Sequence, residues 1–490
     1  MKRFTLAVLA GLMVMAFASV AAAEITVGGS IDIRYDLWQD INLNSRATNY
    51  QTINFFDERV MLNVDAKITE GLEAFIELDT DNTDWGLGTT AGNIPFYLNH
   101  LGNTVAVRQA WINFMVPGLP VGMKIGHQPL ALGHGIWLDT HRYGSDAILV
   151  YSKPMPELLV AAAYVQGSQS LPSTPVFPGA FNRIGAGLGT DILATGFFSS
   201  EKNDADFYAV LANFTWMENN TVGVNLTYVD DKASIGNNIW ATNAAIVLDG
   251  AIAGLNYKGE VDWLYVNTED IFGADRDYLV NAWAMMLGVN MNVMNMVNVG
   301  AEVAYGTGND DNRPGIFYNP GAAMVGAVTN RMDHAYYTPY NSTSYNYAFL
   351  YNDKIGQGPL GVGGGFGFGD GFGGFGLANT GYVKVSVGMN PTDRLKVGMD
   401  ALYLRASETM IAGQSRDLGW EVDANIGYKL YDNLNLDVTG GVFIPGAWYA
   451  FQGHAPVTSS TAILTDSGDP SSPIKRSTAW GMETKLSVKF

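Results

Sequence analysis

The 490-residue sequence contains no cysteine. A long chain in an oxidising compartment usually relies on disulfides, so this one must close its structure by another route. Basic residues are also few, because 28 lysines and arginines stand against 47 aspartates and glutamates, for a formal net charge of −19. Such acidity argues against nucleic acid and anionic lipid headgroups as partners, since both carry negative charge.

Long apolar runs are absent after the first 23 residues. The nearest candidate, residues 278–305, is interrupted by five asparagines. A membrane-spanning helix needs about 20 predominantly apolar residues. If the remaining chain spans a membrane, it must do so with strands whose backbone groups pair with one another in a closed barrel.

The amino-terminal segment has the layout of a secretory signal peptide. Met1-Lys2-Arg3 is basic, residues 4–20 are almost continuously apolar, and Ala21-Ala22-Ala23 supplies small residues for cleavage. We therefore expect residues 1–23 to be removed and residues 24–490 to form a single domain. A retained membrane helix is the alternative, but the cleavage residues directly precede a strand pattern.

Segments of alternating apolar and polar residues recur along the whole chain. In the last of them, Trp480, Leu486 and Phe490 fall on one side, whereas Lys485 and Lys489 fall on the other. Strict alternation predicts a strand with one apolar and one polar face. Eighteen such segments have about the ten-residue length that a tilted membrane strand needs. They are 25–36, 59–68, 72–79, 105–115, 121–129, 146–154, 158–166, 205–216, 221–229, 239–248, 254–265, 277–291, 297–305, 380–390, 395–405, 418–431, 434–443 and 479–490.

The connections between these segments alternate in length. Turn residues such as 70–71 and 432–433 follow even-numbered segments, whereas long connections such as 130–145 and 306–379 follow odd-numbered ones. Short periplasmic turns and long extracellular loops are typical of even-stranded outer-membrane barrels. We therefore predict an all-β transmembrane antiparallel β-barrel with eighteen strands, or sixteen as the alternative. A strand of a soluble β-sandwich would explain one such segment, but not the alternation of short and long connections along eighteen segments.

Closure of such a barrel requires the first and last strands to pair. We expect 479–490 to lie beside 25–38, with Lys485 and Lys489 across from Asp32 and Asp36. Eight tryptophans fall near predicted strand ends, which favours the two aromatic girdles of a membrane barrel. They are Trp38, Trp111, Trp216, Trp240, Trp263, Trp283, Trp420 and Trp480.

If the apolar side faces lipid, the polar side of each strand lines the lumen. This side carries charges of both signs, which cannot be buried without water, so we predict a water-filled interior. The residues expected to line the pore near a constriction are Asp32, Arg34, Asp36, Arg59, Asp65, Lys67, Glu73, Glu77, Asp79, Arg108 and Lys124. Most other acidic residues fall in loops and turns, where they would concentrate cations at the mouths.

Two further patterns could indicate other chemistry. The segment 361–376 formally contains Gly-x-Gly-x-x-Gly, but no helix pattern follows it, so it does not predict a nucleotide site. It is either a loop folded into the pore, a surface for sugars or partner proteins, or a flexible external loop. His127, His134 and His141 are seven residues apart, yet prolines and glycines oppose the helix that would align them. No nucleophile motif accompanies these histidines. We therefore expect no metal, no cofactor and no enzymatic activity.

These features together resemble Gram-negative outer-membrane porins. The segment Val107-Arg-Gln-Ala-Trp-Ile112, followed by Gly126-His127-Gln128, is similar to the Arg-Gln-Ala and Gly-Arg-Gln elements of porins and alginate-export-type channels. The resemblance covers the chain in architecture but only two strands in motif, and His127 stands where an arginine is expected. It implies Arg108 at the eyelet, and Phe490 as a terminal signal for the barrel-assembly machinery. It also implies an outer-membrane lipid environment and a homotrimer.

The leading hypothesis is an outer-membrane channel for passive diffusion of small hydrophilic solutes or ions, with a weak preference for cations. A barrel that acts as a scaffold or sheath for a partner protein or exported polymer is the alternative. An outer-membrane hydrolase is the third hypothesis.

Overall fold

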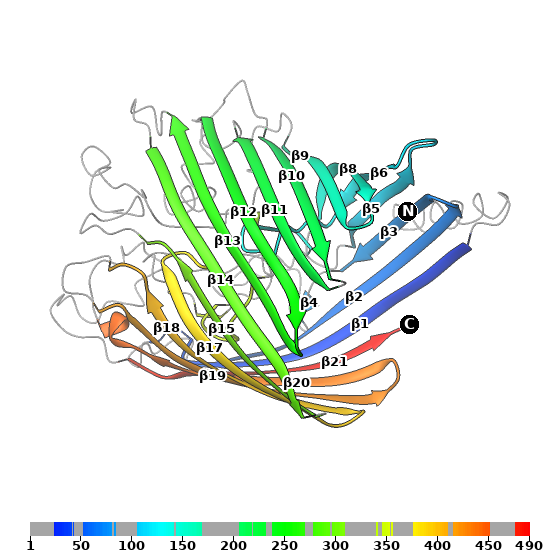
Figure 1. Ribbon diagram of the computed structural model, residues 1–490. Helices are drawn as coiled ribbons and strands as arrows, with labels where there is room; N and C mark the ends of the chain where they lie inside the picture. The colour runs from blue at the N-terminus through cyan, green and yellow to red at the C-terminus, as the bar shows by residue number, and fades with distance from the viewer. Residues whose placement is uncertain are drawn as a thin grey trace, which may run out of the picture.

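The computed structural model is a closed antiparallel β-barrel of eighteen long strands (Figure 1). The structure describes residues 24–41, 43, 52–80, 83–84, 105–141, 144–168, 205–217, 219–231, 238–269, 278–294, 296–308, 340–341, 345–352, 354–355, 376–409, 415–450 and 476–490. The predicted signal peptide and nearly all of the glycine-rich segment lie outside these residues. Among the described residues, no helix is long and apolar enough to cross a membrane.

The eighteen strands follow one another around the ring in chain order, each antiparallel to the next. They are β1 (Glu24–Gln39), β2 (Thr52–Thr69), β3 (Leu72–Asp79), β5 (Ala106–Met115), β6 (Val121–Gln128), β8 (Ser145–Met155), β9 (Leu158–Ser168), β10 (Ala205–Trp216), β11 (Asn220–Asp231), β12 (Asn238–Ile252), β13 (Leu255–Glu269), β14 (Tyr278–Met294), β15 (Val297–Gly306), β17 (Thr380–Thr392), β18 (Leu395–Ala406), β19 (Asp417–Tyr431), β20 (Leu434–Pro445) and β21 (Ala479–Lys489). Three two-residue strands, β4 (Thr83–Asp84), β7 (Leu138–Asp139) and β16 (Tyr340–Asn341), and a 3-10 helix, η2 (Ala447–Ala450), complete the described elements. The predicted fold class and strand number are confirmed.

Pairing of β1 with β21 closes the ring, as predicted, but the expected register is wrong. Lys485 lies opposite Arg34 and Lys489 opposite Ser30, so the strand is shifted by two residues from the expectation. The shift follows from Phe490, whose backbone exchanges hydrogen bonds of 2.9 and 3.1 Å with Gly29 and extends the pairing to the last residue. A two-residue shift keeps every side chain on its face, so alternation alone does not determine it.

The apolar side of the strands forms the outer surface. On β17, for example, Val383, Val385 and Val387 are 46–54% exposed, whereas Tyr382 between two outward positions is buried. Trp283, Trp420 and Trp480 are also exposed on this surface. Trp38 is an exception to the predicted girdle. It is buried on the inner face, because it shares the side of the strand that carries Asp36, and it packs against Phe349.

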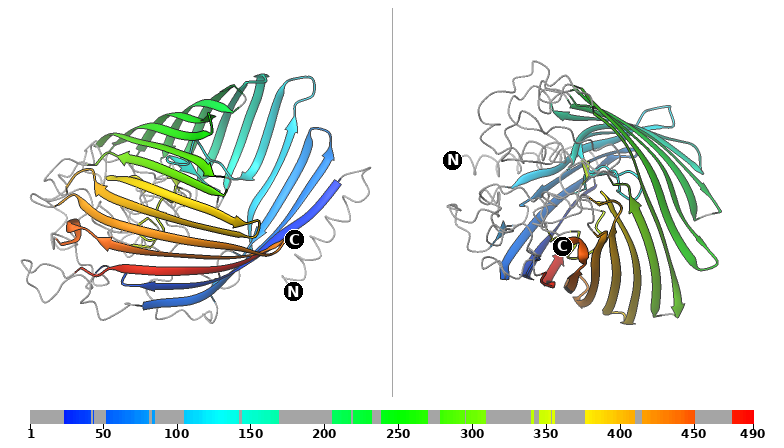
Figure 2. Two further views of the ribbon diagram at one scale, coloured as in Figure 1. Left: turned by 60° about the horizontal axis from the view of Figure 1, so that its bottom comes forward. Right: turned by 90° about the vertical axis from the view of Figure 1, so that its left-hand side faces the viewer.

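Two connecting segments lie inside the ring (Figures 1 and 2). The first, residues 130–141, follows β6 and contacts β5 at one end and β13 at the other. The second, residues 345–355, precedes β17 and packs against β1, β17, β19 and β20. Both segments therefore occupy part of the lumen, which the alternation of the strands had predicted to be filled with water.

These segments cover an apolar part of the inner wall near the loop ends of the strands. Leu132, Ile136 and Trp137 of the first segment belong to the same buried cluster as inward side chains of β9–β20. Those side chains include Val165, Phe207, Ala209, Val229, Ala241, Leu264, Val266, Val280, Ala282, Ala284, Met286, Tyr382, Leu402, Leu404 and Leu418. The prediction of a uniformly charged inner wall is therefore wrong for the loop end of these strands, although inward charged side chains also occur on β13, β15, β17 and β19. Charged side chains line the inner face of β1, β2, β3 and β5.

Candidate functional site

Arginine–carboxylate pairs line the inner face of β1, β2, β3 and β5. Arg34 donates two hydrogen bonds to Asp57, at 2.8 and 2.7 Å, and its guanidinium also lies 3.9 Å from Glu483. Arg34 is 17% exposed, whereas the Asp57 side chain is almost fully buried. A bidentate pair of this kind fixes both side chains and neutralises both charges locally.

The next two pairs continue this row. Arg59 donates to both carboxylate oxygens of Asp79, with Nε 3.0 and 3.1 Å from them. Arg108 donates to Glu77 at 2.8 Å and lies 3.9 Å from Asp79. Arg108 also donates to the backbone carbonyl of His141, at the end of the first inward segment. We call these three pairs the charge row. Its members are Arg34, Asp57, Arg59, Glu77, Asp79 and Arg108.

Asp32 and Asp36 adjoin the charge row, because Asp32 lies opposite Arg59 on β2 and Asp36 is close enough to Arg34 and Asp57 to interact with their charges. Asp32 accepts a hydrogen bond from Ser487, and Asp36 is buried beside Lys354 of the second segment. Lys67 lies near the turn end, where it is 62% exposed and 4.0 Å from Glu24. Glu73 accepts a hydrogen bond from Asn113 at 2.8 Å.

Lys124 and Asp65 also belong near the turn end of the barrel. The Lys124 ammonium lies 3.7 Å from the centre of the Trp111 ring, a favourable cation–π contact. Asp65 lies opposite Thr26 on β1 and Phe75 on β3. The structure therefore brings together seven of the predicted residues, whereas Asp65, Lys67, Glu73 and Lys124 lie nearer the turn end. The seven are Asp32, Arg34, Asp36, Arg59, Glu77, Asp79 and Arg108.

Asp57 and Lys354 belong to the site but were not predicted. The alternation used to define the second strand begins at Arg59, although β2 starts at Thr52, and Asp57 shares the inward side with Arg59 two residues later. A longer strand would have included it. Lys354 lies in a connection without periodicity, 4.7 Å from the Trp38 ring, and no local sequence signal places it in the lumen.

A second charged cluster lies across the lumen on β13, β15 and β17. Glu302 lies 2.7 Å from the Lys258 ammonium and 3.5 Å from that of Lys384, and it accepts a hydrogen bond of 2.6 Å from Tyr382. The Tyr382 ring stacks on Tyr347 of the second segment. Burial raises the pKa of the Tyr347 phenol, so it remains neutral. The second segment thus adds aromatic surface here without adding negative charge.

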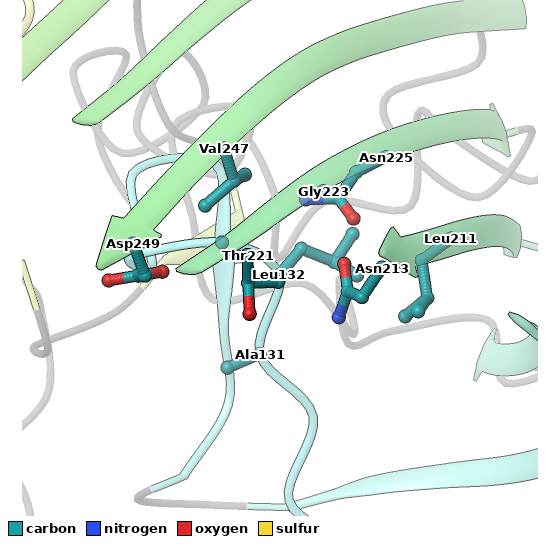
Figure 3. A pocket seen from close by; sticks show the side chains of 10 residues that line it. Ala131, Leu132, Leu211, Asn213, Thr221, Gly223, Asn225, Val247 and Asp249 are labelled. Carbon is teal, nitrogen blue, oxygen red and sulfur yellow. The ribbon is translucent and has the colours of Figure 1, made fainter. Parts of the chain in front are cut away.

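A cavity of about 190 Å³ lies between the first segment and the inner faces of β10, β11 and β12 (Figure 3). Its polar lining comes from Asn213, Thr221, Asn225 and Asp249, and Leu132 is among its apolar residues. The volume corresponds to roughly six water molecules at liquid density. Residues 131–133 therefore do not seal against this part of the wall, and polar, water-accessible space remains beside them.

The three histidines of the sequence pattern contact three different carboxylates. His127 hydrogen bonds to Asp146 and His141 to Asp139, each at 2.8 Å, whereas His134 lies 3.7 Å from Asp249. No group of three potential metal ligands occurs among the described residues. Each imidazole therefore has a separate carboxylate neighbour, and the three do not form one centre.

We expect the Phe490 side chain to matter for assembly more than for stability. Its backbone pairs with Gly29, and its ring is 60% exposed. Phe490→Ala should lower the amount of folded protein in the outer membrane by about half or more, while the stability of refolded protein changes by less than about 0.5 kcal/mol. Cell fractionation and urea unfolding in detergent check the two parts. Equal membrane levels for both proteins would contradict the signal role.

No protein-family model matches the sequence. No curated protein matches it either. Solved structures, in contrast, match along nearly the whole chain. OpdK of Pseudomonas aeruginosa, solved with vanillate, has a TM-score of 0.52 at 10% identity and covers 95% of this chain and 98% of that one.

Two other channels give the same result. OccK2 (OpdF) of Pseudomonas aeruginosa has a TM-score of 0.53 at 9% identity, with coverage of 95% and 98%. A BenF-like porin from Pseudomonas fluorescens Pf-5 has a TM-score of 0.52 at 9% identity, with coverage of 95% and 99%. Identities this low establish the fold and not the solute. The chain has the fold of the Gram-negative outer-membrane porins.

Proposed function

We propose that this protein forms a water-filled channel in the outer membrane, through which small hydrophilic solutes diffuse passively. The observation that carries the proposal is the charge row. Five of its six members were expected on the polar side of the strands, and its arginines remain 17–19% exposed beside two segments that otherwise fill the ring with apolar side chains. Partly exposed arginines on an inner wall need water. The permeation path runs along β1, β2, β3 and β5.

A weak preference for cations follows from the distribution of charge. Within the charge row each arginine has a carboxylate partner, so the wall carries no strong local excess of either sign. The chain as a whole is acidic, with 47 carboxylate residues against 28 basic ones. An acidic surround attracts cations over about a Debye length, which is roughly 10 Å at 0.1 M salt.

Planar-bilayer recording on purified, refolded protein tests both parts of this proposal. We expect discrete conductance steps, and a permeability ratio for K⁺ over Cl⁻ between about 1 and 3 that falls towards 1 as salt rises. Absence of steps would contradict the channel, and co-purification of a stoichiometric partner would then favour a scaffold or sheath. A clear anion preference would contradict the charge argument alone.

The proposal assigns no enzymatic activity to the barrel. The side chains of His127, His134 and His141, the three described histidines, contact carboxylates and a carbonyl. The serine nearest to His141 in the sequence, Ser145, donates its hydroxyl to Thr140 at 3.1 Å. Esterase and protease assays on the refolded protein test this assignment directly. Turnover that is lost in a histidine variant would overturn it.

A further inference from the structure

The tripeptide Glu-Val-Asp occurs twice in the sequence, as Glu260–Asp262 on β13 and as Glu421–Asp423 on β19. In both copies the valine faces outward, with Val261 and Val422 43% and 40% exposed. The two acidic residues of each copy point inward and are buried. Burial of a carboxylate is costly unless it accepts hydrogen bonds, so each copy needs donors inside the barrel.

The first copy receives its donor from the first inward segment. The backbone N–H of His134 donates to Glu260 Oε2 at 2.5 Å. Gly133 makes this approach possible, because its φ is +56° and a Cβ atom there would lie 2.6 Å from the Glu260 Cδ atom. Asp262 accepts a hydrogen bond of 3.0 Å from Asn243 on the neighbouring strand. The segment is thus attached to β13 through a single backbone donor.

The second copy receives three donors from the second inward segment. Leu350 and Tyr351 donate their backbone N–H groups to the two oxygens of Glu421, at 2.5 and 2.8 Å. The N–H of Phe349 lies 3.3 Å from Asp423 Oδ2. Three successive backbone donors therefore converge on one Glu-Val-Asp copy, and the attachment uses both oxygens of its glutamate.

The two inward segments are also joined to each other. Leu138 and Asp139 of β7 pair in parallel with Tyr340 and Asn341 of β16, shortly before the second segment. Backbone contacts thus join β13 to residues 130–141, β7 to β16, and residues 349–351 to β19. We call residues 130–141, 340–341 and 345–355 the crossbar.

We propose that the two Glu-Val-Asp copies are the end anchors of this crossbar, and that they fix the cross-section of the permeation path. The inference rests on the proposed channel function. It assigns Glu260 and Glu421 as positioning residues, which act by holding backbone donors rather than by touching the solute. Glu260 accepts one backbone N–H of the crossbar, whereas Glu421 accepts two. Variants that differ in the number of acceptor oxygens should therefore affect the two positions differently, which tests the proposal.

Four variants compare acceptor number at constant side-chain length. Met removes both acceptor oxygens, whereas Gln keeps one. Glu421→Met should raise open-channel current noise by about two-fold or more, and Glu421→Gln by an intermediate amount, because one of two donors loses its acceptor. Glu260→Met should show the large effect, and Glu260→Gln should match the unmodified channel. Glu73→Met is the matched control, since Glu73 accepts its hydrogen bond from Asn113 on β5 rather than from the crossbar.

Spin-label mobility tests the anchors without any current. The chain has no cysteine, so a cysteine at Ala131 or at Asn352 is a unique labelling site. We expect Glu260→Met to mobilise a label at 131 and Glu421→Met one at 352, while a label at the outward Val385 stays unchanged. Immobile labels in both variants would overturn the anchor proposal. Unchanged current noise in conducting Met variants would show that the two glutamates do not fix the cross-section of the permeation path. An unmodified protein that is ordered but does not conduct would overturn only the channel function.

Discussion

Replacing residues 131–139 by two glycines should raise single-channel conductance by about two-fold or more, because it removes the segment that crosses the lumen from β5 to β13. The neck of the segment makes this deletion feasible. Thr140 donates its backbone N–H to Leu130 at 2.8 Å, and its hydroxyl oxygen accepts the Leu130 N–H at 3.0 Å. Two glycines can close such a neck without moving β6 or β8. Planar-bilayer recording measures the change.

The control replaces Asp432 and Asn433, the turn between β19 and β20 at the opposite end of the barrel, with two glycines. This change should leave conductance within the spread of the unmodified channel. Removal of the first segment also uncovers the apolar wall near Phe207 and Leu264, so we expect a lower unfolding midpoint in detergent. Unaltered conductance in a folded deletion variant would show that residues 131–139 do not limit the path.

Opposite changes in the charge row should move ion selectivity in opposite directions. Arg59→Gln combined with Arg108→Gln leaves Glu77 and Asp79 without their cations, and the K⁺ over Cl⁻ permeability ratio should rise about three-fold or more. Glu77→Gln combined with Asp79→Asn leaves both arginines, and the ratio should fall below 1. Reversal potentials in asymmetric KCl measure both.

Lys67→Gln is the matched control for these variants, because it removes one positive charge from a side chain that is 62% exposed at the turn end. Its reversal potential should change little at 0.1 M salt, where surface charges are screened beyond roughly 10 Å. The same sign of shift in both double variants, or a larger shift in Lys67→Gln, would place the permeation path elsewhere in the ring.

The strands were predictable because each carries its own evidence. An outward valine and an inward lysine alternate on β17 whatever the rest of the chain does, and a turn such as Glu70–Gly71 marks where pairing must reverse. The register between strands that are distant in the sequence was harder to predict. The expected pairing of Lys489 with Asp32 and of Lys485 with Asp36 preserved every face yet missed the shift imposed by Phe490 and Gly29. Strand ends were also underestimated, which excluded Asp57.

The interior was predictable only where strands alone build it. Arg34, Arg59 and Arg108 were placed on the inner face by alternation, and their partners lie on neighbouring strands. The crossbar has no periodic pattern, so nothing local predicts that Trp137 is buried or that Lys354 lies over Trp38. The inward apolar residues of β14, such as Val280 and Ala282, blurred its alternation for the same reason. They face a segment that lies far away in the sequence.

The closing pair of strands also constrains the order of folding. Ser487 donates to Asp32 across 455 residues, whereas His134 and Glu260 are 126 residues apart and Leu350 and Glu421 only 71. Contacts of large sequence separation form late, because loop closure costs entropy before the contact offsets it. The crossbar is therefore attached to both walls while the ring is still open. Closure of β1 against β21 then encloses an interior that is already built.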